Sequence, residues 1–447
     1  MEDLWLQRRV KALTVRQQDH RSPFQRDRAR ILHSAAFRRL QSKTQVMGSG
    51  QSDFYRTRLT HSLEAAQIGS GIVAQLRSKF PEDAKRLMPK EDALIESICL
   101  AHDIGHPPFG HGGEVALNYM MRQHGGFEGN GQTLRIVSTL EPFSEHHGMN
   151  LSRRTLLGLL KYPQTIENLQ KAELTPEPNH FRQLKAADWH PPKGIYADDI
   201  SVLDWILEPL SEADRIEFQR CRETKGGHLK TQFKSLDCSI MELADDIAYG
   251  IHDLEDAIVT HIVQQKDFER HVIEKLKSSE DEWVRIYANT LADKLFSDKH
   301  HLQKDAIGGL VNYLITSIAL EQVEGVNGYQ FEEPLLKYNA KLPPHAMQVL
   351  QIFKDFVFDF VIKQTSIQRI EYRGQQLVME LFEALISDPL RLLPKNTAKR
   401  YLDAQNNNKN AYRVIADYVA GMTDEYATRL YQTLFIPSNG SYRDPNS

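Results

Sequence analysis

The sequence predicts a protein built almost entirely of α-helices. In residues 92–102, for example, apolar side chains fall at positions 94, 95, 98, 99 and 101, a helical stripe rather than strict alternation. Alternating runs of Val, Ile and Thr are scarce, and Asn-Gly turns typical of β-hairpins are few. We therefore expect an all-α fold. The other helical stripes cover residues 61–78, 240–263, 307–322, 346–363, 375–387 and 411–434.

The start of the chain is basic, although the net charge of the 447 residues is −4. Residues 1–58 hold thirteen Lys and Arg residues against five Asp and Glu residues. Such an excess suits an anionic partner, such as a nucleotide, a nucleic acid or an acidic neighbouring subunit, and an exposed solvated surface is an equally good interpretation. We treat residues 1–30 as a basic N-terminal arm.

Functional side chains gather where the helix at 92–102 ends. Three histidines and two carboxylates fall within residues 102–114. Pro107 and Pro108 end or sharply turn the helix that carries His102, because proline has no backbone N–H to donate. The pattern predicts a helix end that runs into a loop rich in glycine and proline, a common position for functional residues.

The rest of the chain divides by composition. Residues 163–235 contain six prolines, many charges and weak periodicity, which indicates an insertion or substrate-lining lobe with short helices. We expect this lobe to belong to a catalytic core over residues 31–265, followed by a C-terminal helical region over residues 266–447 that packs on the core.

Composition excludes several classes of protein. Hydrophobic residues make up 41% and charged residues 26%, as in an ordinary globular protein. No run of eighteen apolar residues appears, and the N-terminus does not have the pattern of a signal peptide. The three cysteines, Cys99, Cys221 and Cys238, form neither a disulfide framework nor a zinc-finger spacing. A cytoplasmic protein without a membrane partner is the expectation.

Adjacent His102 and Asp103 offer imidazole and carboxylate ligands to a metal ion. A mononuclear site needs about four protein ligands, so two must come from elsewhere. His61 opens a predicted helix, and Asp245 and Asp246 lie in an otherwise apolar helix, where a carboxylate is costly to bury unless paired or coordinated. Each residue alone is more often hydrogen-bonded or exposed, but this order across three helices predicts a metal site.

This order resembles the HD superfamily of metal-dependent phosphohydrolases. Within it, the chain resembles the deoxyguanosine triphosphate triphosphohydrolase (dGTPase) family and its dGTPase-like members. The stretches that carry this closer resemblance are residues 22–28, 36–46, 56–62, 102–114, 244–249 and 421–424. The resemblance implies an HD-domain helical core with additional C-terminal helices. It also implies one divalent ion per active site, held by His61, His102, Asp103 and Asp245.

The choice between the two aspartates follows from spacing and resemblance together. Asp245, Tyr249 and Asp253 are spaced i, i+4, i+8 and so lie along one helix face. In the family, a metal-binding aspartate, a tyrosine and a second aspartate have this spacing, and the last two contact the deoxyribose 3′-hydroxyl. We favour Asp245 as the ligand and Asp246 as structural. The ion stays open, since such a site accepts Mg²⁺, Mn²⁺ or another first-row divalent ion.

The resemblance implies hydrolysis of deoxynucleoside triphosphates to deoxynucleoside and inorganic triphosphate, with attack at the α-phosphorus. His111 and Glu114 resemble the family's catalytic pair. Glu114 would orient the imidazole and raise its pKa, and His111 would act either as a general acid to the leaving 5′-oxygen or as a water-orienting base. His106 is a third candidate, either contacting phosphate or hydrogen-bonded within the loop.

Five further residues resemble substrate contacts of the family. Arg58, Lys161 and Tyr162 match residues that contact phosphate. Gln45 matches a residue near the sugar 3′-hydroxyl, and Val46 its neighbour beside the base. For each, a surface ion pair or a core contact is the alternative. Tyr249, stacked on the sugar, would also disfavour a ribose 2′-hydroxyl.

The choice of base, dGTP or a broader set of dNTPs, is open, and Arg413 and Tyr418 are candidates only. The resemblance also implies a homo-oligomer, often a hexamer, and single-stranded DNA or a nucleotide as an effector in some members. Two alternative functions remain: an HD-type phosphodiesterase or phosphohydrolase acting on another nucleotide, and a catalytically dormant nucleic-acid-binding regulator.

Overall fold

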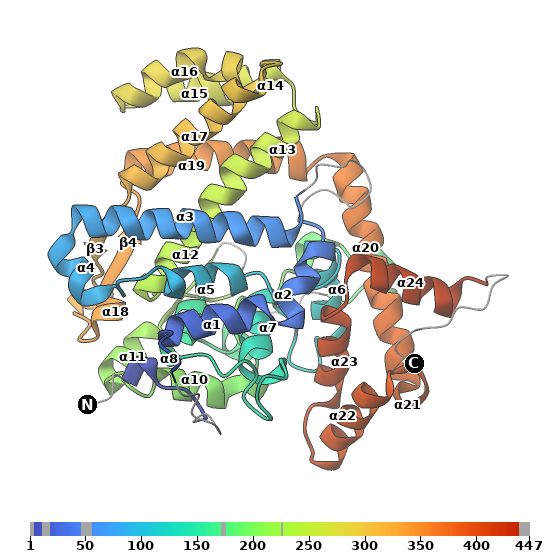
Figure 1. The fold of residues 1–447 in the computed structure, drawn as a ribbon. Coiled ribbons are helices and arrows are strands. Elements are labelled where there is room, and N and C mark those ends of the chain that lie inside the picture. Colours follow the sequence, from blue (N-terminus) through green and yellow to red (C-terminus); the bar gives the residue numbers. More distant parts are fainter. Residues whose placement is uncertain (1–3, 11–17, 46–55, 171–175, 225–226, 438–447) are drawn as a thin grey trace.

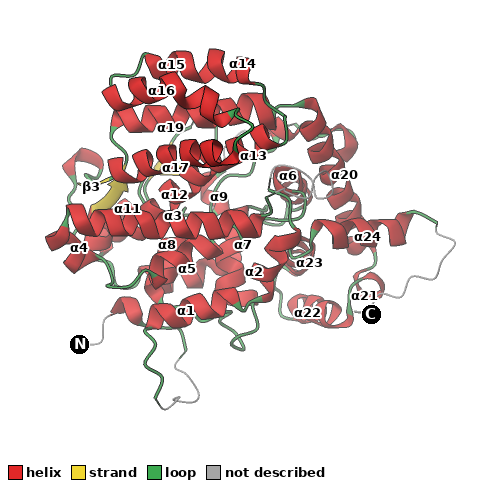
Figure 2. Ribbon diagram, turned by 45° about the horizontal axis from the view of Figure 1, so that its top comes forward, coloured by secondary structure: helices red, strands yellow, loops and turns green. Residues whose placement is uncertain are grey.

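The computed structural model describes residues 4–10, 18–45, 56–170, 176–224 and 227–437 (Figures 1 and 2). Helices dominate this part of the chain, which confirms the all-α prediction. Among the described residues, no helix is both long and apolar enough to cross a membrane.

The helices follow one another closely along the chain. Those of the first half are α1 (Pro23–Leu32), α2 (Ala35–Arg39), α3 (Arg58–Lys79), α4 (Pro81–Leu87), α5 (Ala93–Ala101), α6 (Gly110–Met120), α7 (Gly129–Arg135), α8 (Arg153–Leu159), α9 (Ile166–Leu169), α10 (Ile200–Leu207), α11 (Glu212–Phe218) and α12 (Leu236–Ile247). Those of the second half are α13 (Asp253–Val259), α14 (Gln265–Phe268), α15 (Glu274–Lys277), α16 (Glu282–Leu295), α17 (His300–Ser317), α18 (Pro334–Lys337), α19 (Pro344–Val357), α20 (Thr365–Ser387), α21 (Pro389–Leu392), α22 (Lys395–Asn406), α23 (Ala411–Ala420) and α24 (Asp424–Phe435).

Shorter elements join these helices. Four are π-helical turns: Ile136–Leu140, Ala248–His252, Glu269–Ile273 and Phe358–Ile362. Short 3₁₀ turns are Leu4–Leu6, Leu40–Ser42, Phe181–Gln183, Ala186–Asp188, Ala197–Asp199 and Val326–Gly328. Two antiparallel hairpins pair β1 (Cys221–Arg222) with β2 (Lys230–Thr231) and β3 (Ala319–Gln322) with β4 (Tyr338–Lys341).

Two predicted helices end differently in the structure. The helix expected over 307–322 stops at Ser317, because residues 319–322 pair with β4 instead. The helix expected over 411–434 is two helices, since the chain breaks at Gly421 and Thr423 starts α24 by accepting a hydrogen bond from the backbone N–H of Tyr426. In both cases the helix ends before the apolar stripe does, because other groups bind the backbone. These are strand β4 in the first case and the Thr423 side chain in the second.

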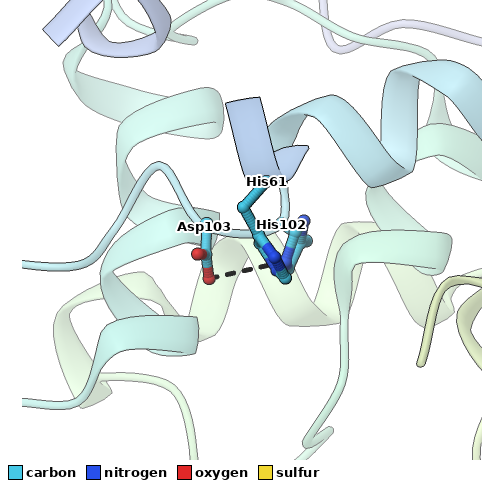
Figure 3. A group of neighbouring side chains, drawn as sticks. All are labelled: His61, His102 and Asp103. Carbon is cyan, nitrogen blue, oxygen red and sulfur yellow. Dashed lines mark ion pairs between the residues drawn. The ribbon is translucent and has the colours of Figure 1, made fainter. Parts of the chain in front are cut away.

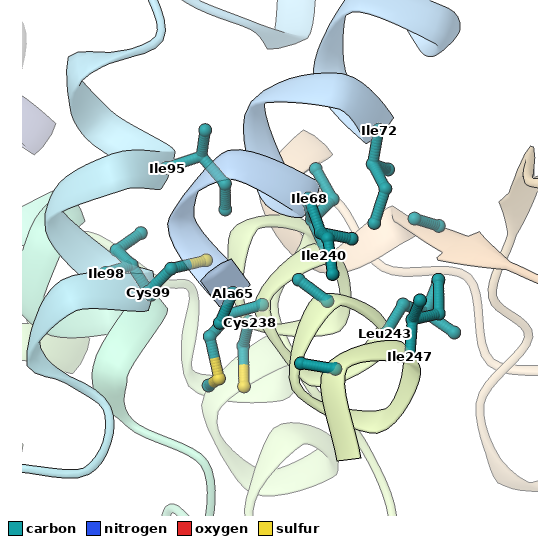
Figure 4. Close-up of a cluster of buried hydrophobic side chains, with 14 of the residues drawn as sticks. Ala65, Ile68, Ile72, Ile95, Ile98, Cys99, Cys238, Ile240, Leu243 and Ile247 are labelled. Atoms are coloured by element: carbon teal, nitrogen blue, oxygen red, sulfur yellow. The ribbon is translucent and has the colours of Figure 1, made fainter. Parts of the chain in front are cut away.

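The central core is formed by α3, α5 and α12, which pack against one another (Figure 4). Small residues let these helices approach: a Cβ added at Gly69 of α3 would lie 2.9 Å from Cys99 Sγ of α5. This packing positions the site, because α3 begins, α5 ends and α12 ends in the same region. The buried core side chains labelled in Figure 4 are Ala65, Ile68, Ile72, Ile95, Ile98, Cys99, Cys238, Ile240, Leu243 and Ile247.

The C-terminal helices form a second cluster. Helix α20 runs along α6 and also contacts α23 and α24 (Figure 1). Helices α14 to α16 lie at the opposite end of the molecule, at the top of both Figures 1 and 2. The C-terminal cluster therefore lies against the helix that follows the loop of residues 102–109.

Candidate functional site

Four potential metal ligands come from the ends of three core helices. His61 lies in the first turn of α3, which Thr57 starts with a capping box. Asp245 lies near the end of α12. Helix α5 ends at Ala101, so His102 and Asp103 lie in the turn just beyond it, earlier than the break expected at the two prolines.

The early end of α5 has a local cause. The hydroxyl of Thr133 in α7 donates to the backbone carbonyl of His102 at 3.0 Å and accepts from the backbone N–H of Gly105 at 3.0 Å. These bonds take a carbonyl that would otherwise lack a partner at the helix end. Gly105 itself approaches α7 so closely that an added Cβ would lie 2.2 Å from the backbone nitrogen of Thr133.

The four side chains converge. Ligand atoms of His61, His102 and Asp103 all lie within 4.8 Å of one another, and all three residues are buried (Figure 3). Asp245 Oδ1 lies 3.0 Å from His61 Nε2 and 3.5 Å from His102 Nε2. Asp246 points elsewhere and pairs with Lys354 of α19 at 2.6 Å. This geometry favours Asp245 over Asp246 as the ligand.

The surroundings of His102 fit a bound cation. Its Nδ1 lies 2.6 Å from the carbonyl of Cys99, which fixes the tautomer and leaves the Nε2 lone pair directed at the cluster. His102 Nε2 is buried and has no hydrogen-bond partner within the described part of the chain, yet it lies 3.5 Å from a carboxylate oxygen of Asp103. Two imidazoles and two carboxylates suit a first-row divalent ion.

Charges around the ligands are balanced within the protein. Burial alone would lower the pKa of His61, but Asp245 raises it to about 9. Burial opposes ionisation of Asp103, but His106, His102 and Arg58 hold its pKa well below the usual range. Arg58 Nη1 lies 2.7 Å from Asp103 Oδ2, so this buried arginine adjoins the ligand cluster.

His106 adjoins the ligand cluster through Asp103. Its Nδ1 lies 3.0 Å from Asp103 Oδ1, and burial together with Arg58 lowers the pKa of His106. On its other side, a Cβ added at Gly129 would lie 3.6 Å from His106 Nε2. His106 Nδ1 has no hydrogen-bond partner among the described residues, so both expectations for His106, a bond within the loop and contact with phosphate, stay predictions.

His111 and Glu114 form a pair on the first turn of α6. His111 Nδ1 lies 3.0 Å from Glu114 Oε2, and Glu114 Oε1 accepts a 2.8 Å hydrogen bond from the backbone N–H of Gly129. The hydrogen bond to Glu114 raises the pKa of His111. Burial disfavours ionised Glu114, but His111 keeps its pKa low. An exposed imidazole is thus held by a buried carboxylate.

Two of the predicted sugar contacts, Tyr249 and Asp253, lie in or just after a π-helical turn. The π-helical turn Ala248–His252 lies between Asp245 and Asp253. Eight residues of regular α-helix would rotate the second aspartate by about 80° relative to the first, and a π turn reduces this drift. Asp253 is buried, and burial raises its pKa to about 7. Gln45 Oε1 is buried without a hydrogen-bond partner among the described residues, whereas Val46 lies outside them.

Three lysines lie near Asp245 and Tyr162. Lys161 Nζ lies 3.4 Å from Glu242 and 3.8 Å from Asp245 Oδ2. Tyr162 is buried, and Lys230 Nζ and Lys234 Nζ lie 5.6 Å and 5.1 Å from its ring centroid. Lys161 and Tyr162 line a small hollow that is too tight to hold a water molecule. Its other lining residues are Asn130, Gly131, Leu134, Leu159, Leu160, Gly194 and Ile195.

Sequence reasoning missed Lys193 and Lys43. Lys193 is exposed, and its charge acts on both His111 and Glu114. Lys193 follows two prolines and precedes Gly194. This short segment resembles the proline- and glycine-rich loop at 102–114, and that similarity could have indicated a functional residue. Lys43 is buried, which lowers its pKa to about 7, and it donates to the carbonyl of His106 at 2.5 Å.

The two candidates for base recognition, Arg413 and Tyr418, make contacts within the protein. Arg413 is only 1% exposed, its guanidinium lies 3.6 Å from the ring centroid of Tyr196, and it donates to the carbonyl of Gly125 at 3.1 Å. These contacts connect α23 to the segments around Gly125 and Tyr196. The hydroxyl of Tyr418 contacts that of Tyr426 at 3.1 Å.

Comparison with known proteins identifies the family of the chain. Residues 58–250 match the HD domain and residues 340–433 match the phosphohydrolase-associated domain. The chain is 57% identical over 446 residues to the deoxyguanosinetriphosphate triphosphohydrolase-like protein of Shewanella halifaxensis, covering 100% of this chain and 99% of the relative. A protein of the same name from Shewanella pealeana is 58% identical over 445 residues, covering 99% of each. One from Aliivibrio fischeri is 57% identical over 437 residues, covering 97% of each. The chain therefore belongs to the deoxyguanosinetriphosphate triphosphohydrolase-like family of HD-domain phosphohydrolases.

Proposed function

We propose that this protein hydrolyses deoxynucleoside triphosphates to the deoxynucleoside and inorganic triphosphate. The observation that carries the proposal is that the ligand cluster adjoins both a cation and the surroundings of the His111–Glu114 pair. Lys161 lies 3.8 Å from Asp245, and His106, which lies 3.0 Å from Asp103, adjoins Gly129, whose backbone N–H donates to Glu114. Such an arrangement suits a polyphosphate whose reacting phosphorus lies at the ligands. The names of the relatives support the same class of substrate.

His61, His102, Asp103 and Asp245 would hold one divalent ion. When bound, such an ion polarises a phosphoryl oxygen and lowers the pKa of bound water. The remaining cations are supplied by the protein. Arg58, beside Asp103, and Lys161, beside Asp245, would neutralise phosphate charge that develops during the reaction.

The chemical step needs a proton at the leaving oxygen. Water attacks the α-phosphorus, the bond from phosphorus to the 5′-oxygen breaks, and His111 donates a proton to that oxygen. Glu114 favours this role because it raises the pKa of His111 and so increases the protonated fraction at neutral pH. Its second oxygen is fixed by Gly129, so the imidazole is oriented by a carboxylate that is itself held.

The sugar side of the site supports a deoxyribose. Asp253 is buried with Oδ2 unpaired within the described residues, and Gln45 has an unpaired buried oxygen as well. Unpaired buried polar atoms are costly, so a ligand hydroxyl that pairs with them would bind specifically. Tyr249 would lie against the sugar and leave no room for a 2′-hydroxyl.

The test is a panel of the four dNTPs and GTP with purified protein, in Mg²⁺ or Mn²⁺, and products separated by anion-exchange chromatography. We expect a deoxynucleoside and inorganic triphosphate from one or more dNTPs and little turnover of GTP. Release of monophosphate and pyrophosphate, or no turnover of any dNTP, would contradict the proposal. Turnover of a cyclic nucleotide instead would select the phosphodiesterase alternative.

A further inference from the structure

One carboxylate connects the C-terminal cluster to two parts of the site. Asp424, the first residue of α24, is buried. Its Oδ1 accepts a 2.9 Å hydrogen bond from the backbone N–H of Phe109, in the loop that precedes His111. Its Oδ2 accepts from the backbone N–H of Thr44 at 2.9 Å and from the hydroxyl of Thr44, next to Gln45. These are charge-assisted bonds, which are the stronger kind.

A second buried side chain closes the same connection from the other direction. Lys43 Nζ donates to the carbonyl of His106 at 2.5 Å and to the carbonyl of Ala420 at 2.9 Å. The segment at 43–45, the loop at 106–109 and the turn before α24 are therefore tied to one another by two side chains. We call Asp424 and Lys43 with their partners the clasp.

The loop held by the clasp contains a residue in an unfavourable backbone conformation. Phe109 has a φ of +61°, in the left-handed region that disfavours residues with a side chain. Its ring packs on α20 so closely that a Cβ added at Gly374 would lie 2.3 Å from Phe109 Cβ. The backbone N–H of Phe109 donates to Asp424. The C-terminal helices therefore fix the backbone conformation of the residue that precedes α6, the helix that carries His111.

We propose that Asp424 is a positioning residue, through which the C-terminal helices fix His111 and Gln45 relative to the ligand cluster. This inference rests on the proposed function, because its test measures the rate of dNTP hydrolysis. It explains what the phosphohydrolase-associated region contributes to a site whose ligands all come from the HD domain. A displacement of His111 by about 1 Å is enough to cost up to 100-fold in rate.

The experiment substitutes Asp424→Asn. The amide keeps one acceptor oxygen but turns an N–H group toward one of the two backbone N–H groups, so one arm of the clasp must open. We expect kcat on the best dNTP to fall by roughly 10- to 100-fold. Affinity for Mn²⁺, measured by calorimetry, stays unchanged because Asp424 contacts none of the four ligands. Hydrogen exchange in peptides that cover residues 104–112 becomes faster.

Asp214→Asn is the matched control. Asp214 in α11 is also fully buried and accepts from two backbone N–H groups of another segment, Glu332 at 3.0 Å and Glu333 at 2.8 Å, and from the hydroxyl of Tyr329 at 2.9 Å. Helix α11 lies at the other side of the molecule from α24 (Figures 1 and 2). We expect a lower Tm for this variant and an unchanged kcat.

Thr44→Val provides a milder test, since it removes only the hydroxyl bond to Asp424. We expect it to fold and to weaken the preference for dNTPs over 3′-deoxy analogues, because Gln45 follows Thr44. An unchanged kcat in Asp424→Asn, or an equal loss in Asp214→Asn, would overturn the proposal. If the wild-type protein hydrolyses no dNTP, the proposed function fails, and the exchange measurement then decides the clasp alone: unchanged exchange at 104–112 would overturn it.

Discussion

His111 and Glu114 lie one helical turn apart in opposite surroundings. The His111 side chain is 62% exposed, and that of Glu114 is 4% exposed. A buried carboxylate with no cation would be costly, so the contact with His111 also stabilises Glu114 in its ionised form. This asymmetry lets one residue meet a substrate while the other remains part of the core.

Glu114→Gln tests the proton-transfer role of His111. An acid must be protonated, so kcat falls as pH rises through the pKa of His111. Glu114 raises that pKa, and its removal shifts the alkaline limb of the kcat profile to lower pH. We expect a loss in kcat of about two orders of magnitude at pH 8 and a smaller loss at pH 6. If His111 is instead the base, the acidic limb of the kcat profile moves to lower pH, and the alkaline limb stays in place.

Lys193→Gln tests the cation that sequence reasoning missed. Lys193 is exposed and acts electrostatically on His111 and Glu114, so we expect it to contact the triphosphate. Loss of one charged hydrogen bond would raise KM for a dNTP by about tenfold, measured by steady-state kinetics. Lys185→Gln, an exposed lysine in the same lobe, is the control and should leave KM unchanged. Equal effects of both substitutions would show that only net surface charge matters.

The residues that sequence could predict are those with local signals. His102 and Asp103 are adjacent, and Asp245 precedes Tyr249 and Asp253 at helical spacing, so residue type and spacing pointed to them. Asp424 was part of a recognised stretch, but its contacts with Thr44 and Phe109 join segments more than 300 residues apart. No local pattern encodes such a contact, because it depends on how the helices pack.

At the scale of elements, apolar periodicity predicted where helices lie, but it predicted only some of their ends. Helix α20 ends at Ser387, as its predicted stripe at 375–387 does, but begins ten residues earlier, at Thr365. Helix α3 exceeds its predicted range of 61–78 only slightly. The stripe at 240–263 was interrupted by the π-helical turn Ala248–His252 and ended at Val259. A π turn changes the hydrogen-bond partner without changing the apolar pattern, so periodicity could not reveal it.

Gly112→Ala tests the contact between α6 and α20. A Cβ at Gly112 would lie 2.4 Å from the backbone carbonyl oxygen of Glu371, so the two helices must separate. We expect a loss of about 1–3 kcal/mol in unfolding free energy, measured by urea denaturation, and a lower kcat since His111 adjoins Gly112. Gly308→Ala is the control: nothing lies within 4 Å of its added Cβ, so the higher helix propensity of alanine should stabilise α17. A stable, fully active Gly112→Ala variant would contradict the packing described.

At the scale of the whole molecule, the site depends on the fold as a unit. Its four proposed ligands come from segments around residues 61, 102 and 245, which only the packed core brings together. The His111–Glu114 pair follows on α6, which packs against α20 of the C-terminal cluster. Assembly from distant segments means that an ion bound at the site favours the folded chain over the unfolded one.

Metal binding should therefore raise thermal stability. Substituting Asp245 and Asp246 in turn separates the loss of a metal ligand from the loss of a nearby charge. At an Mn²⁺ concentration 100 times the Kd, a ligand that binds only the folded state stabilises it by about 2.7 kcal/mol. We expect Mn²⁺ to raise the Tm of the EDTA-treated wild-type protein in differential scanning fluorimetry. Asp245→Asn removes a ligand that lies 3.0 Å from His61, so the rise should be lost. Asp246→Asn breaks only the ion pair with Lys354, so its Tm starts lower but rises with Mn²⁺ as in the wild type. The reverse result would assign the ligand to Asp246 and overturn the choice made from the geometry.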